Sequence, residues 1–130
     1  MRTPRGTSMI EMMAGALVLI PIVLLAVDGA YVVICSKANQ ELADTAARIA
    51  ANKTNQNDAR DAAMNVVAKY HKTDNMDAVK IEMMDYRLAQ RILRIRVGMD
   101  VRMPVPLPGM SSTHLNAESM HAIVGIPATR

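Results

Sequence analysis

The stretch that decides the fold runs from Arg5 to Cys35 and reads RGTSMIEMMAGALVLIPIVLLAVDGAYVVIC. Its apolar part, Met12 to Cys35, holds 24 residues, of which only Asp28 is charged. A helix of that length is about 36 Å long, which is enough to cross a hydrocarbon core about 30 Å thick. Pro21 predicts a kink rather than an end, because a membrane helix can re-satisfy the carbonyl that a proline frees. The stretch therefore predicts a transmembrane helix.

The charges on either side of this helix predict its orientation. Arg2 and Arg5 precede the apolar run with no acidic residue before them, whereas the residues after Cys35 are of mixed charge. The positive-inside tendency places the N-terminus in the cytoplasm and residues 36–130 outside. A cleaved secretory signal stays open as an alternative, although this apolar run is longer than a usual signal core and ends in bulky side chains. A plain single-pass anchor also stays open.

The residues before the apolar run form a recognisable pattern. A short basic leader ends in Gly6, the next residue is Thr7, and Glu11 lies five positions after the glycine. A carboxylate at the end of a membrane helix is costly unless a positive group pairs with it. The pattern resembles the class III, prepilin-type signal, in which a membrane peptidase cleaves after the glycine. The resemblance implies cleavage between Gly6 and Thr7, and a contact between Glu11 and the new α-amino group of a neighbouring helix.

Over residues 5–52 the wider pattern resembles the TadE-like pseudopilins of the tight-adherence (Flp pilus) system. The residues that carry this resemblance are Arg5-Gly6, Glu11, Ile20-Pro21 and Asp28-Gly29. Two features depart from the family pattern: Met12 stands where aromatic residues are common, and no residue separates Asp28 from Gly29. The resemblance implies a minor pilus subunit or assembly factor. Its partners would be the membrane, prepilin peptidase and other pilin or pseudopilin subunits, which it would contact through the N-terminal helix.

Composition narrows the classes of function. Without the leader, the formal side-chain charge falls from +3 to +1, because two of the 15 basic residues belong to the leader. The only aromatic residues are three tyrosines, so neither a basic patch nor a stacking surface predicts nucleic-acid binding. The histidines show no metal-ligand spacing, and no glycine-rich phosphate loop is found in the sequence. We expect a structural protein rather than an enzyme, with no metal or cofactor.

Two residues of the apolar stretch have two interpretations each. Asp28 lies 16 residues after Met12, which is about 24 Å along a helix and near the outer membrane boundary. Its carboxylate either reaches headgroup water or makes a buried contact with a partner helix, for which Gly29 would permit close approach. Cys35 is the only cysteine, so it is either a small apolar residue on a helix face or a link between two subunits.

The chain divides into a leader at 1–6, a transmembrane and assembly helix at 7–35, and a small extracytoplasmic α+β domain at 36–130. A high density of alanine and an apolar stripe predict that the first helix continues to about Asn52 as an amphipathic helix. A second, short helix is expected to be capped by Asn57 or Asp58 and to end near His71.

After the helices, the apolar residues recur with a period of two. This alternation predicts strands at 79–83, with Val79, Ile81 and Met83 on one face, and at 93–103. A third strand is expected from Ser119 to Ile126, which makes a small antiparallel sheet of about three strands. A loop through Asn116 is expected between the last two strands, because three prolines stop the second of them: Pro104, Pro106 and Pro108.

The polar face of the second strand carries Arg94, Arg96 and Arg102. This is either a solvated sheet face, which is the ordinary case, or a patch for an anionic partner.

From these patterns we predict a pseudopilin-like subunit in the inner membrane or in a surface filament, with its C-terminal domain outside the cytoplasm. Two alternatives remain at this point. One is an unprocessed, single-pass envelope binding protein, and the other is a pseudopilin of a type II secretion or type IV pilus machine.

Overall fold

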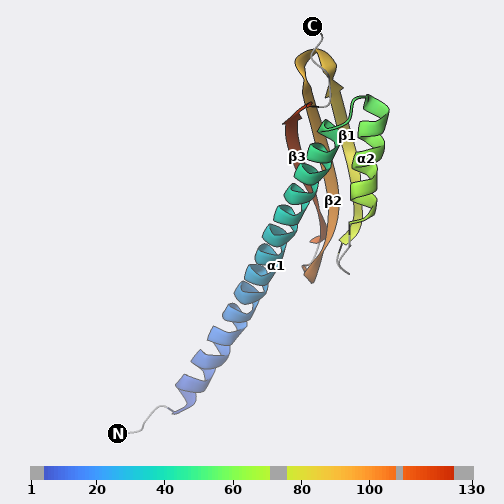
Figure 1. Ribbon diagram of the computed structural model, residues 1–130. Coiled ribbons are helices and arrows are strands. Elements are labelled where there is room, and N and C mark those ends of the chain that lie inside the picture. The colour runs from blue at the N-terminus through green and yellow to red at the C-terminus, as the bar shows by residue number, and fades with distance from the viewer. Residues whose placement is uncertain (1–4, 71–75, 108–109, 125–130) are drawn as a thin grey trace.

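The computed structural model describes residues 5–70, 76–107 and 110–124 and has the predicted α+β class. Two helices pack on a three-stranded antiparallel sheet, and half of the first helix projects away from the rest of the molecule (Figure 1). The elements in chain order are α1 (Arg5–Ala51), α2 (Gln56–Ala68), β1 (Met76–Arg87), the short 3-10 helix η1 (Leu88–Gln90), β2 (Ile92–Leu107) and β3 (Met110–Ala122).

Helix α1 confirms the prediction of one continuous helix through the apolar and amphipathic stretches. It contains 47 residues, which corresponds to a length of about 70 Å. Pro21 lies inside α1, and the helix continues past it. The predicted start of the second helix is wrong by two residues. The side chain of Asn55 accepts the 2.8 Å hydrogen bond from the Asp58 N–H that caps α2, and His71 lies outside the described residues.

The sheet has the strand order β1-β2-β3, so β2 is the central strand. The strands predicted at 79–83 and 93–103 are confirmed as parts of β1 and β2. The predicted face of Met83 is wrong, because Glu82 forms a bulge between the pairs Ile81–Val97 and Met83–Arg96. A bulge adds one residue and shifts the alternation, so Met84 rather than Met83 packs against the core.

The third strand and the loop before it differ from the prediction. Strand β2 continues through Pro104 and Pro106, and β3 begins at Met110 rather than at Ser119. Within the described residues, the pairing of β1 with β2 stops at Met76 and Val101, and the regular pairing of β2 with β3 is interrupted between residues 102 and 107. Prolines are tolerated there because an edge or an irregular stretch needs fewer ladder hydrogen bonds. Pro108 and Ile126 lie outside the described residues.

The core lies between the helices and one face of the sheet. On the sheet side it consists of alternating residues of β2, among which Leu93, Ile95 and Val97 are fully buried. On the helix side α1 contributes small residues at helical spacing, namely Ala43, Ala46, Ala47 and Ala50, which are also fully buried. Alanines let the helix backbone approach the sheet closely, so the large side chains of β2 fill the space between the two layers.

Candidate functional site

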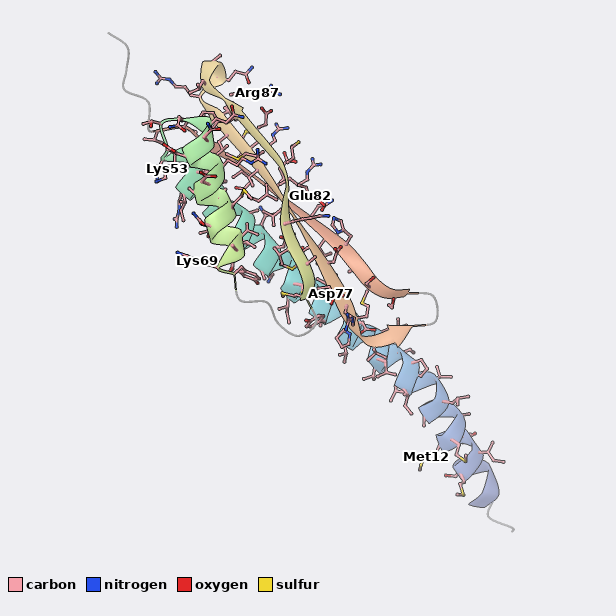
Figure 2. All side chains as sticks on the ribbon, turned by 90° about the vertical axis from the view of Figure 1, so that its right-hand side faces the viewer. Met12, Lys53, Lys69, Asp77, Glu82 and Arg87 are labelled. Carbon is pink, nitrogen blue, oxygen red and sulfur yellow. The ribbon has the colours of Figure 1, made fainter. Side chains whose placement is uncertain are left out.

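The projecting half of α1 is the most unusual surface of this molecule. Every side chain from Ser8 to Val27 is exposed, over a helix length of about 30 Å. Most of these side chains are apolar, and within the described residues no other element covers them. Figure 2 shows Met12 on this part of α1, far from the sheet. By length and composition, the described residues therefore contain one candidate membrane-crossing helix, near the N-terminus.

The predicted processing and assembly residues lie at the beginning of this helix. Gly6 and Thr7 belong to the first turn of α1. Glu11 follows about one turn later, and its side chain is exposed. None of the ion pairs among the described side chains involves Glu11. Its carboxylate is thus open to a group from outside the described part of the chain.

Asp28 marks the end of the uncovered part of the helix. Its side chain is only 4 % exposed, and its Oδ1 accepts a 3.1 Å hydrogen bond from the backbone N–H of Val105. The contact is buried and comes from the chain's own β2–β3 hairpin, a partner that neither interpretation of Asp28 included. No local pattern predicts this pairing, because it joins residues 77 positions apart. At Gly29 an added Cβ would meet nothing within 4 Å, so packing within the described chain does not require this glycine.

Cys35 lies about two helical turns after Asp28 on α1. It is fully buried and packs with Met76, Met99 and Val101 in a small apolar cluster. This confirms its interpretation as a small apolar residue on a helix face.

Polar side chains on the C-terminal half of α1 hold the sheet against the helix. The buried amide of Asn39 donates hydrogen bonds to the carbonyl of Val97 on β2, at 3.1 Å, and of Leu115 on β3, at 3.0 Å. Asp44 accepts a 3.0 Å bond from Ser119 Oγ and lies 2.7 Å from His121 Nε2. The hydrogen bond with His121 is the main reason that the pKa of Asp44 is lowered. These contacts fix the domain relative to the projecting half of α1.

The arginines on the outer face of the sheet are paired with carboxylates. Arg94 and Arg96 lie 3.1 and 2.7 Å from the two carboxylate oxygens of Glu118 on β3. Arg102 lies 2.8 Å from Asp77 on β1. The hydrogen bond with Arg96 is the main cause of the lowered pKa of Glu118. Because each arginine has an acidic partner on a neighbouring strand, this face matches the interpretation of a solvated sheet face.

A histidine on the same face joins all three strands. His114 on β3 contacts Asp100 on β2 through Nδ1, and its Nε2 lies 2.9 Å from Glu82 on β1. Glu82 can lie across β2 because Gly98 has no side chain; an added Cβ at Gly98 would come within 2.4 Å of Glu82 Oε1. The hydrogen bond with Asp100 is the main cause of the raised pKa of His114. The described residues contain no group of three His, Cys, Asp or Glu side chains suited to a metal ion.

This cluster predicts a pH dependence of stability. The folded state favours the protonated form of His114, whose ordinary pKa is 6.5. The stabilisation is fully present below that pH and is lost as the pH rises through the raised pKa. We expect the melting temperature of the detergent-solubilised protein to fall between about pH 6 and pH 9, and to fall less in a His114→Asn variant. Equal falls in the two proteins would contradict the assignment.

Comparison with known proteins does not assign the chain to a family. No family model matches the chain, and no match is found among curated proteins or solved structures. The architecture itself is pilin-like, since a long apolar N-terminal helix runs on into a small domain in which the same helix packs against an antiparallel sheet.

Proposed function

We propose that the chain is a pilin-like structural subunit of the TadE-like type, which joins other pilin-like subunits in the inner membrane or in a surface filament. The observation that carries this proposal is the uncovered apolar half of α1, from Ser8 to Val27. An apolar surface of this extent is not stable in water and requires lipid or other apolar helices around it. Its length of about 30 Å equals the thickness of a bilayer core.

The residues at the start of α1 give this surface a role in assembly. In the proposed function, prepilin peptidase removes residues 1–6 by cleavage between Gly6 and Thr7. The new α-amino group of one subunit then pairs with the carboxylate of Glu11 on its neighbour. The exposure of Glu11 supports this step, because a neighbouring helix can reach the carboxylate without any rearrangement of the domain.

The domain at the other end of α1 is held outside the cytoplasm in this arrangement. The hydrogen bonds of Asn39 and Asp44 tie the sheet to the outer half of the same helix. A subunit built in this way places its sheet at a fixed position relative to the packing helix. We therefore propose a structural role rather than an enzymatic one, with no metal or cofactor and no nucleic-acid partner.

Site-specific photo-cross-linking in the native cell tests this proposal. A photoreactive residue in place of Leu17, which is 78 % exposed on α1, is expected to form cross-links with other pilin-like subunits. Leu88 in η1 is the matched control, because it is also an exposed leucine but lies at the far end of the sheet. Cross-links to lipid alone from position 17 would contradict the assembly role and leave a plain membrane anchor.

A further inference from the structure

We propose that the groove between α2 and the edge of β1 binds an extended, acidic segment of a partner protein, which adds a strand to the sheet. The partner is defined by its chemistry, since apolar side chains alternate with carboxylates along the bound segment. The groove lies on the domain, so the proposal does not depend on the membrane insertion of α1. Four features carry it: the shape of the groove, the backbone edge of β1, the apolar lining and the charges.

The groove has the shape of a slot between a helix and a strand. Its volume is about 580 Å³. Figures 1 and 2 show α2 alongside β1, which is the outermost strand on that side of the sheet. The strand wall consists of the consecutive residues Val79 to Met84, which span about 20 Å. The helix wall consists of residues that share one face of α2, namely Gln56, Arg60, Met64, Val67 and Ala68.

The strand wall presents the open backbone edge of β1. Within the described residues β1 is paired with β2 alone. In an antiparallel strand, part of the N–H and C=O groups point away from the neighbouring strand. Among the described residues, no hydrogen bond from outside the β1–β2 ladder reaches the backbone between Val79 and Met84. An extended peptide can pair with this edge by β-augmentation.

The side of the groove that faces the core is apolar. Val79, Ile81 and Met84 of β1 pack against the core but are only partly buried. Across the groove, Met64 on α2 is 51 % exposed. Apolar side chains on one face of an added strand would lie beside those of β1 and beneath α2, because successive side chains of a strand point to opposite faces. Such binding would remove an exposed apolar surface from water.

The charges of the groove favour an acidic segment. Arg60 and Lys80 line the groove, and none of the ion pairs among the described side chains involves either of them. The carboxylate of Glu82 also lines the groove, but its Oε1 already lies 2.9 Å from His114 Nε2. Carboxylates on the bound segment would therefore complement the groove. A fatty acid would match these cations and the apolar lining, but it would leave the backbone edge without partners.

Fluorescence anisotropy of the full-length protein in a non-ionic detergent tests the proposal. The probe is a synthetic peptide of about eight residues, about 26 Å long when extended, in which valine alternates with glutamate and which carries a neutral fluorophore. We expect saturable binding, and an affinity about fivefold lower for a Lys80→Glu variant. Lys69→Glu is the matched control and is expected to bind normally, because Lys69 lines the hollow between α1 and α2 instead.

Two further comparisons test the backbone pairing and the location. The same peptide with N-methyl groups on alternate amides is expected not to bind, because it lacks the donors that pair with β1. An Ala68→Trp variant is expected to lose binding as well, since Ala68 is exposed and its replacement fills the groove.

The remaining outcomes would overturn the proposal. They are no binding of the acidic peptide, equal binding of the N-methylated peptide, and equal binding of a peptide in which lysine replaces glutamate. Each of them would leave the proposed assembly role of α1 untouched, because that role is tested separately by cross-linking from position 17.

Discussion

The free energy of unfolding of the Ile95→Ala variant is expected to be about 2–5 kcal/mol lower than that of the original protein, because truncation of a buried isoleucine leaves a cavity. Ile95 is fully buried on the central strand, opposite Met84 on β1 and Ser119 on β3. The core has few other large residues, since α1 contributes mainly alanines to it. Small domains have only about 5–15 kcal/mol of stability in total, so this loss is a large fraction.

Chemical unfolding of the full chain in detergent, followed by circular dichroism, measures this effect. The matched control is Ile49→Ala, because Ile49 lies on α1 with 38 % of its surface exposed. We expect the control to lose less than about 1 kcal/mol. Equal losses in the two variants would mean that β2 does not form the centre of the core.

The Glu11→Ala variant is expected to enter the membrane and yet fail to join other subunits. In the proposed function, Glu11 pairs with an α-amino group in surroundings with little water. Loss of one member of such a pair costs about 2–5 kcal/mol, which weakens association by at least about thirtyfold. The reason for the large effect is that the neighbour's positive group would be left without a partner.

The amount of this protein that co-purifies with other pilin-like subunits measures the effect of Glu11→Ala. Glu41→Ala is the control, because Glu41 is another exposed glutamate on α1, beyond the apolar part. We expect the control variant to associate normally. Normal association of Glu11→Ala would show that Glu11 does not make the proposed assembly contact. This conclusion would hold whether or not residues 1–6 are removed.

Local patterns in the sequence were sufficient for much of the fold. The apolar run and the alanine density predicted α1, because a helix is stabilised by contacts between near neighbours in the chain. The alternation of Leu93, Ile95 and Val97 with arginines predicted β2 for the same reason. The structure has Asn55 as the cap of α2, whereas the sequence predicted Asn57 or Asp58. The prediction was wrong because several polar residues of similar capping ability follow one another.

The missed features depend on contacts between distant residues. Three prolines normally end a strand, but β2 continues past Pro104, beyond its described pairing with β1, and Asp28 binds Val105 there. In the same way, the sequence around Asn39 and His114 does not reveal which carbonyl or carboxylate each will contact. In the candidate site, the uncovered apolar helix could be predicted from composition. The burial of Asp28 could not be predicted, because it depends on the position of the folded sheet.

The mature N-terminus of the protein, measured by mass spectrometry of membranes from the native cell, tests the central claim most directly. The proposed function predicts a chain that begins at Thr7, and a full-length chain when Gly6 is replaced in a Gly6→Leu variant. A native chain that still begins at Met1 would contradict the pilin-like processing and leave an unprocessed, anchored envelope protein. A chain that begins beyond Cys35 would contradict membrane assembly through α1 altogether.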